Sequence, residues 1–362
     1  MTDTASGSSH PIHPAPAPPP RGSKVREPGE VLTLVPYHLG FAPGRCVVAL
    51  IVRQGLLGGY ARVPTPENGW REVPDECWVA ASRGLRSAWG DDEVRGPWDG
   101  AILMSFDLSL EHSRQGMARL AIACALAGLP VIDRLTVSRG RWCEFGCEQL
   151  DEWRPVPRPV DVPAVSEYVG IGVAPVAGRE HLRARFAVDP ARSAPVAEAL
   201  ATLKQEYRLD TVRGIEAVTR WVSAADCVFV EHDPHEIAQG LALLEHGLWR
   251  DALYSRVAPA MTGLLVCTPL EKAAQAQMPE CPGDVTSQLA DIAAYAPPGH
   301  RGSLLAVIAL AHWAMGRGAL ACAAAEEALA DQPGQSMAET VLTGLSHGLE
   351  ADPARWPLSI SA

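Results

Sequence analysis

The sequence predicts an α/β (or α+β) protein in which an amino-terminal mixed sheet with covering helices precedes an all-helical half. Between residues 46 and 145, short β-branched and apolar runs alternate with two stretches that have helical signals. This order is typical of a strand, helix, strand crossover in a sheet covered by helices. After residue 163, strand patterns nearly vanish and apolar residues recur at helical spacing.

Changes in composition divide the chain into six segments. The start holds seven prolines and no apolar periodicity, so we expect it to be disordered. Residues 318–333 resemble the second helix of a tetratricopeptide unit and its terminal proline. We therefore expect the helical half to end in a tetratricopeptide-like helical hairpin. The segments are a tail over 1–28, an α/β domain over 29–150, a Pro-rich linker over 151–162, helical regions over 163–262 and 263–352, and a tail over 353–362.

The expected sheet begins with a continuous apolar run, 46–52, which predicts a strand buried on both faces. The turn "RQGLLGG" makes 59–63 its hairpin partner. Ser109 and Gly128 have the residue types that begin and end helices, so a helix over 109–127 should connect two further strands. The remaining expected strands are 101–106, 129–137 and 141–145.

Helices account for the rest of the expected fold. An amphipathic helix is predicted at 75–89, where apolar residues follow helical spacing. The other expected helices are 163–171, 178–187, 192–207, 209–224, 235–247, 249–257, 284–295, 302–316, 318–331 and 335–349.

The string Pro36-Tyr37-x-x-Gly40-Phe41-x-Pro43 could be a ligand-binding loop or a joint between a helix and a strand. Pro36 lacks an amide donor, so we expect it to interrupt the preceding helical segment. Gly40 suits the left-handed position that closes a helix. These structural roles of Pro36 and Gly40 favour the joint. A buried Tyr37 hydroxyl would still need a hydrogen-bond partner.

Composition excludes several classes of protein. The net charge of −11 and the pI near 5.5 argue against nucleic-acid or anionic-membrane binding, because both need clustered Lys and Arg. The longest nearly uncharged apolar runs are about 13 residues, whereas a bilayer span needs roughly 20. The first residues lack the apolar core of a secretory signal, and the nine cysteines are interpreted as reduced. We expect a cytoplasmic protein.

Asp133 is the strongest candidate for a buried charge. Strand alternation would place Val131, Asp133 and Leu135 on one apolar face, where an unpaired carboxylate is costly. Arg62 and Arg141 are the arginines in plausible reach, and a guanidinium binds a carboxylate bidentately. The pair could be structural, could line a ligand site, or Asp133 could face water at an edge.

Asp107 follows an apolar strand and precedes a helix start, the place where open α/β sheets bind ligands. The surrounding "SFDLSLEHS" contains no Gly-rich phosphate loop. Capping of the following helix is therefore the simpler interpretation of Asp107.

Two groups of residues raise the question of a metal. Glu231, His232, Asp233, His235 and Glu236 could bind zinc, but Asp233 followed by Pro234 also predicts a helix start. The C-x3-C formed by Cys143 and Cys147 has no second pair at zinc-ribbon spacing. We predict no metal and no cofactor.

The order of several segments resembles a known family. The strings are "LTLVPYHLGFAPGRCVVALIV", "ARVP", "GLPVIDRLTVSRGRWCEF" and "GSLLAVIALAHWAMGRGALACAAAEEALADQPGQSMAETVL". Together they resemble the actinobacterial family catalogued as domain of unknown function 4192, over roughly residues 30–350. Pro64 stands where that family commonly has an acidic residue, so a role for that carboxylate does not carry over. The resemblance implies a fold and leaves the activity open.

Two functions follow from the sequence. The first is a non-catalytic protein that acts through protein contacts, because no complete catalytic constellation is present. Residues 261–362 carry ten acidic and four basic side chains, which favours a basic partner. The alternative is a small-molecule-binding protein or enzyme with a site at the carboxyl edge of the sheet. The candidate lining residues are Tyr37, Arg62, Asp107, Asp133 and Arg141.

Overall fold

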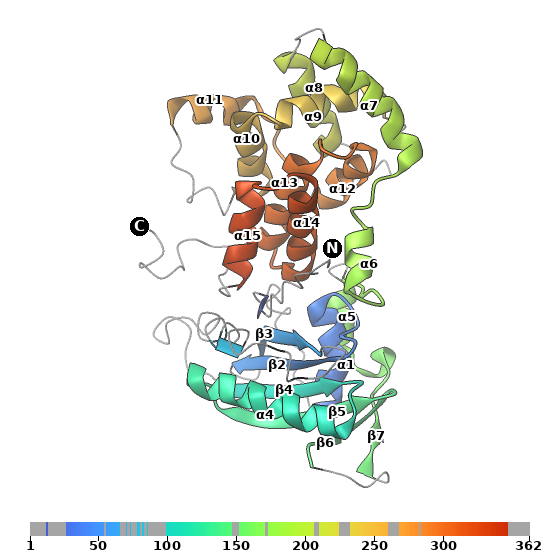
Figure 1. Ribbon diagram of the computed structural model, residues 1–362, viewed down its shortest axis with the longest axis vertical. Helices are drawn as coiled ribbons and strands as arrows, with labels where there is room; N and C mark the ends of the chain where they lie inside the picture. Colours follow the sequence, from blue (N-terminus) through green and yellow to red (C-terminus); the bar gives the residue numbers. More distant parts are fainter. Residues whose placement is uncertain are drawn as a thin grey trace, which may run out of the picture. The chain divides into compact units, whose positions relative to one another are not determined.

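The chain folds into two compact units in the computed structural model (Figure 1). The first unit is 1–179 with 344–349, and the second is 180–343 with 350–362. The helix expected at 75–89 lies largely outside the described residues. These are 12–13, 27–53, 56–65, 70, 73, 78, 79, 82, 85, 99–146, 152–170, 173–205, 210–223, 232–259, 268–281 and 284–346.

A seven-stranded sheet forms the centre of the first unit. The sequence predicts a mixed sheet here, with five of these strands. The strand order is β1-β3-β2-β4-β5-β6-β7. Strands β4 and β5 pair in parallel and are joined by helix α4 (Leu110–Ala127), while the other neighbours pair antiparallel. The strands are β1 (Ile12–His13), β2 (Cys46–Arg53), β3 (Leu56–Pro64), β4 (Gly100–Phe106), β5 (Val131–Ser138), β6 (Arg141–Glu144) and β7 (Arg154–Pro155).

Helices cover both faces of this sheet. Helix α4 runs along one face (Figure 1), where Met117 and Leu120 pack into a core with Val47 and Leu103. The opposite face meets α1 (Pro28–Leu39), whose His38 ring lies 5.8 Å from the Tyr60 ring. Helix α5 (Pro163–Gly170) packs beside α1. Burial on both faces explains the continuous apolar composition of β2 and β4.

Pro36 does not interrupt the first helix, contrary to the expectation from the sequence. It lies inside the single helix α1, which closes at Gly40 with φ +81°, as predicted. An internal proline costs about 3 kcal/mol. Leu34 and Val35 are each 1% exposed, and burial of such side chains yields about 1.5–3 kcal/mol apiece. Packing against the sheet therefore outweighs the lost backbone hydrogen bond.

The first unit extends past the expected linker. Strand β7 pairs with β6, a 3-10 helix, η3, covers Pro159–Asp161, and Phe41 forms a parallel bridge with Val176. At the other end, Ile12 and His13 of the expected disordered tail pair with β3. Segments with many prolines are thus used at the edges of the sheet.

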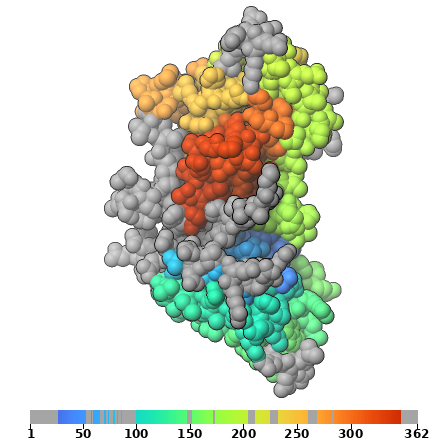
Figure 2. Space-filling view, viewed as in Figure 1, coloured from blue at the N-terminus to red at the C-terminus, as the bar shows by residue number. Residues whose placement is uncertain are grey.

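The second unit is entirely helical over its described residues, as predicted. Helix α13 is buried over almost its whole length and packs in a hairpin with α14. Helix α15 reaches the surface, where it is red in Figure 2. Helix α11 was not predicted; it begins with a capping box formed by Thr268 and Glu271. The helices are α6 (Arg179–Ala184), α7 (Pro190–Gln205), α8 (Thr211–Ser223), α9 (Pro234–Leu244), α10 (Gly247–Val257), α11 (Pro269–Gln277), α12 (Thr286–Tyr295), α13 (Gly302–Ala314), α14 (Gly318–Asp331) and α15 (Ser336–Ser346).

Length and polarity together rule out a bilayer crossing for each helix in the described part of the chain.

Candidate functional site

Asp133 and Arg62 do not form the predicted pair. They belong to β5 and β3, and strands β2 and β4 lie between these two strands. Neighbouring strands are about 4.8 Å apart, so the two backbones are separated by about 14 Å. Arg62 instead donates from Nη2 and Nε to the Pro43 carbonyl oxygen, at 2.9 and 3.3 Å. The Asp133 carboxylate accepts the Arg134 amide at 2.7 Å.

A β-bulge changes the face on which Asp133 lies. Val131 pairs with Ala101, while Asp133 pairs with the next residue, Ile102. The predicted alternation from Val131 to Asp133 is therefore broken, and the two side chains point to opposite faces of the sheet. Asp133 is half-buried on the α1 side, so its carboxylate retains contact with water.

Arg141 lies at the other end of β5 from Asp133. It pairs with Ser138 in the sheet, is exposed, and donates to the Trp153 carbonyl oxygen. This bond attaches β6 to the segment leading into β7. Arg141 therefore has a structural partner and does not reach Asp133.

Asp107 caps a turn and not a helix. Ser109 is the N-cap of α4 and accepts the His112 amide. Asp107 has φ +49°, and its Oδ1 accepts the amide of Arg139, which has φ +50°. Two residues in the left-handed region, which L side chains rarely adopt, thus face each other where β4 ends and β5 turns into β6. The carboxylate stabilises that turn.

The Cys46 thiol is buried close to Asp107 and Arg62. Burial raises the pKa of Cys46 to about 11, although the neighbouring Arg62 guanidinium opposes this shift. Cys46 therefore stays protonated at neutral pH and is not an activated nucleophile. Among the described cysteines, Cys46, Cys124 and Cys281 are free thiols.

Tyr37 lies at the end of α1, where the structure favours a joint over a ligand loop. Its half-buried ring lies 6.1 Å from the ring of Tyr168 on α5. The Tyr168 hydroxyl in turn lies 3.1 Å from His38 Nδ1, and burial raises the pKa of Tyr168 to about 12. Tyr37 and His38 thus hold α1 and α5 together through Tyr168.

The second unit contains a cavity of about 360 Å³, which we call the His312 pocket. It lies between α12, α13 and the residues that follow α6, and no residue in it was predicted as a site. Its volume is within the range of small-molecule pockets. The lining residues are Arg185, Phe186, Thr286, Ser287, Ala290, Asp291, Ala294 and His312.

Small side chains on α12 leave room for this cavity. Ser287, Ala290 and Ala294 recur at spacings of three and four residues, which places them on one helical face. The amino end of α12 is fixed by Asp284, whose carboxylate accepts the Thr286 amide and hydroxyl at 2.9 and 2.6 Å. The helix therefore offers a firm wall with few bulky side chains.

His312 brings a buried polar group to the pocket. Its side chain comes from α13, is 5% exposed, and has no partner for Nδ1 among the described residues. Burial lowers the pKa of His312 to about 3, with a smaller contribution from Arg317. The imidazole is therefore neutral at physiological pH and carries one donor and one acceptor. Its ring contacts the Phe186 ring at a centroid distance of 6.4 Å.

The charges around the pocket are unevenly matched. Asp291 pairs with Arg192 at 3.3 Å and lies 3.9 Å from His232. Arg185 is exposed and pairs with no acidic side chain in the described part of the chain, although its charge acts on His312. The unmatched charge of the lining is thus a guanidinium.

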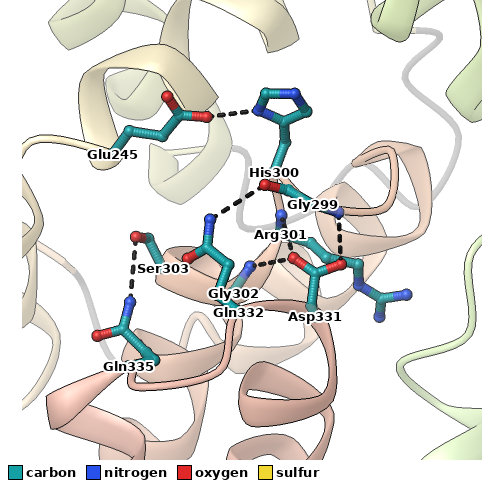
Figure 3. A network of polar contacts seen from close by, with 9 residues as sticks. All are labelled: Glu245, Gly299, His300, Arg301, Gly302, Ser303, Asp331, Gln332 and Gln335. Carbon is teal, nitrogen blue, oxygen red and sulfur yellow. Dashed lines mark hydrogen bonds and ion pairs between the residues drawn. The ribbon is translucent and has the colours of Figure 1, made fainter.

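A polar network surrounds the start of α13 and includes Arg301 (Figure 3). The buried Arg301 donates to the Phe186 carbonyl oxygen. Asp331 fixes the loop before α13 by accepting the amides of Gly299, Arg301 and Gly302, at 2.8, 3.0 and 3.0 Å. These bonds connect α14, the start of α13 and the segment after α6.

His300 and Gln332 complete this frame. His300 Nδ1 lies 2.5 Å from Glu245, and Gln332 donates to the Gly299 carbonyl oxygen at 3.1 Å (Figure 3). Asp331, Gln332 and Glu245 thus each bond to this loop. The loop's position, and with it the Arg301 side chain, is set before any ligand binds.

The residues first considered for zinc begin a helix. Asp233 is the N-cap of α9 and accepts the His235 amide, and Pro234 occupies the first turn. Glu236 pairs with Arg220 at 2.6 Å. Over the described residues, no group of three or more metal-ligating side chains assembles. Glu231 and Cys147 lie outside the described residues.

Comparison with protein families gives one match. The model described as Domain of unknown function (DUF4192) matches residues 28–352. The chain belongs to this family. The DUF4192 match spans both units, so the sheet edge and the His312 pocket both lie inside it. No curated protein and no solved structure matches the chain.

One signal in the sequence could have indicated the pocket. His312 is the one ionisable residue in the apolar run 303–315. A histidine there either finds a partner in the core or faces a cavity. The other lining residues belong to no recognisable motif in this DUF4192 chain.

Proposed function

We propose that this chain is a cytoplasmic, non-catalytic protein that binds a small molecule in the His312 pocket. The observation that supports this most is His312, which lines the cavity and whose buried Nδ1 has no partner among the described residues. An unsatisfied buried polar group costs about 1–3 kcal/mol. A bound ligand would recover this free energy through a hydrogen bond.

Binding fits the pocket better than catalysis. A general acid or base works best when its pKa is near the operating pH. Burial holds the pKa of His312 at about 3, so its imidazole does not exchange protons readily at neutral pH. It can still orient a ligand as a neutral hydrogen-bonding group.

The edge of the sheet supports a ligand site less well. Arg62 and Asp107 already have hydrogen-bond partners within the fold. Arg62 donates to the Pro43 carbonyl oxygen, and Asp107 accepts the Arg139 amide. Polar groups that already have partners lose those bonds when a ligand binds, which reduces the gain. The proposed small-molecule site therefore lies in the helical unit and not at the edge of the sheet.

Protein contact is the second candidate function. The excess of acidic over basic side chains in residues 261–362, ten against four, favours a basic partner. A complex of defined stoichiometry that dissociates as ionic strength rises would support it, because salt screens exposed charges. A complex insensitive to salt would contradict the electrostatic basis of this second candidate.

A thermal-shift screen with nucleotides, amino acids and organic acids tests the main proposal. A ligand that binds only the folded state raises the melting temperature by mass action. We expect at least one compound to stabilise the wild-type chain and to lose its effect on Ala290→Leu, which fills the cavity. Ala197→Leu, at an exposed position on α7, is the matched control and should respond like wild type. Equal stabilisation of the Ala290→Leu chain, or no stabilisation by any compound, would contradict the proposal.

A further inference from the structure

The charges and shape of the His312 pocket indicate a class of ligand. We infer that the pocket takes a small aromatic carboxylate, with the carboxylate on Arg185, the ring against Phe186, and an uncharged polar group hydrogen-bonded to His312. This inference rests on the proposed function and adds the chemistry of the ligand.

The sign of the ligand's charge follows from which ionic groups are already paired. Asp291 pairs with Arg192, a guanidinium that it shares with Asp189 at 3.3 Å. At the amino end of α12, Asp284 pairs with Arg317 at 2.5 Å. An anionic ligand would give Arg185 a counter-charge, whereas a cationic ligand would be repelled by it.

The type of anion follows from the number of free donors. A guanidinium presents a planar fork that matches a carboxylate bidentately. The pocket lining contains one guanidinium and no lysine, and Asp284 already accepts the Thr286 amide and hydroxyl. One guanidinium balances the charge of a singly charged carboxylate, whereas it would balance only half the charge of a doubly charged phosphate.

The remaining wall suits a flat apolar group. Phe186 lies opposite a face of α12 in which Ala290 and Ala294 leave space, and the Phe186 ring already meets the His312 ring at an interplanar angle of 62°. Aromatic rings favour such edge and offset contacts. Because Arg301 holds the Phe186 backbone, this wall is preorganised for a ring.

His312 adds a requirement for one uncharged polar group. Its Nδ1 is without a hydrogen bond among the described residues, and a neutral imidazole can either donate to or accept from a hydroxyl. A ligand with a hydroxyl opposite its carboxylate could therefore use both Arg185 and His312. This makes 4-hydroxybenzoate a suitable probe.

Three probes of one shape separate the effect of charge from that of size. They are 4-hydroxybenzoate, 4-hydroxybenzamide and 4-hydroxybenzamidine, which carry a negative, a zero and a positive charge at pH 7.5. In calorimetric titrations of the full chain at low salt, we expect affinity to fall in that order. Phenyl phosphate should bind more weakly than 4-hydroxybenzoate, and equal or tighter binding of the phosphate would overturn the carboxylate assignment.

Variants assign each contact. Arg185→Ala should weaken 4-hydroxybenzoate by about tenfold or more, since hydrogen bonds to charged groups contribute about 1.5–3 kcal/mol, and should leave 4-hydroxybenzamide unchanged. Arg185→Lys should restore part of the affinity. Arg213→Ala removes the same charge from an exposed position on α8 and should have no effect. Benzoate should bind wild type more weakly than 4-hydroxybenzoate, and His312→Phe should abolish that difference.

The results distinguish this inference from the proposed function. If the amide or the amidine binds as tightly as the carboxylate, or if Arg185→Ala has no effect, the inference is wrong. Binding of none of the three probes also overturns it. The proposed function is judged separately, by whether Ala290→Leu removes the stabilisation found in the screen.

Discussion

The carboxyl edge of the sheet and the His312 pocket contain similar residue types but differ in how those residues are used. At the sheet edge, Arg62 and Asp107 bind backbone groups of nearby turns. In the pocket, Arg185 has no described acidic partner and His312 Nδ1 has no hydrogen bond. Chemically attractive residues near a sheet edge can thus serve folding alone. Groups that the fold leaves unsatisfied are the better guide to a binding site.

The largest expected effect that separates the two regions is acid destabilisation through His312. Its pKa is about 3 when folded, against 6.5 ordinarily, and burial is the main cause while Arg317, Asp284 and Arg185 adjust it. Below pH 6.5 the unfolded chain binds a proton that the folded chain does not. The free energy of unfolding therefore decreases as the pH is lowered. The slope is about 1.4 kcal/mol per pH unit until the folded pKa is reached.

Urea denaturation of wild type and His312→Phe from pH 7 to pH 4 measures this contribution. The free energy of unfolding of His312→Phe should decline less steeply with acid than that of wild type. Parallel declines would show that His312 is not buried as a neutral group.

The next largest effect concerns the frame of the pocket. Asp331→Ala removes a carboxylate that accepts three backbone amides, and we expect a loss of about 2–3 kcal/mol in the free energy of unfolding. Asp210→Ala is the matched control, because Asp210 is 45% exposed and accepts the amide of Arg213. It should cost about 1 kcal/mol or less. Equal losses in chemical denaturation would show that the Asp331 network adds nothing beyond an ordinary cap.

A smaller effect is expected at the sheet edge. Arg62→Met removes two hydrogen bonds to Pro43 and the contact of the guanidinium with the Phe41 ring, 5.4 Å away. We expect a loss of about 1–2 kcal/mol. Thermal denaturation measures it, with the same variant titrated with 4-hydroxybenzoate. A weakened affinity at normal stability would place a ligand at the sheet after all.

The smallest effect is expected at Asp133. Its carboxylate is half-buried and accepts an amide from the next residue, so Asp133→Asn should change stability by about 0.5 kcal/mol or less. A loss above about 2 kcal/mol in urea denaturation would indicate the buried ion pair that the sequence suggested.

Much of the fold could be predicted from the sequence, because it depends on local patterns. The apolar run of β2, the Ser109 cap and the Gly40 helix end each have a signal within a few residues. The bulge at Ile132 depends on pairing with a distant strand, and the continuation of α1 past Pro36 depends on packing against distant strands. Those features have no local signal.

The site was harder to predict for the same reason. Arg185 follows α6, Asp291 belongs to α12 and His312 to α13, and each lies in a stretch of sequence with an ordinary helical pattern. Their grouping depends on how α12 and α13 pack, which no motif encodes. The candidates chosen from the sequence lay near strand ends, where charged residues also serve turns.

The most direct measurement compares 4-hydroxybenzoate binding by Arg185→Ala and Arg62→Met, using calorimetry under identical conditions. The account predicts at least about a tenfold loss for Arg185→Ala and wild-type affinity for Arg62→Met. Loss of binding in Arg62→Met together with unchanged binding in Arg185→Ala would contradict it, and would return the site to the sheet.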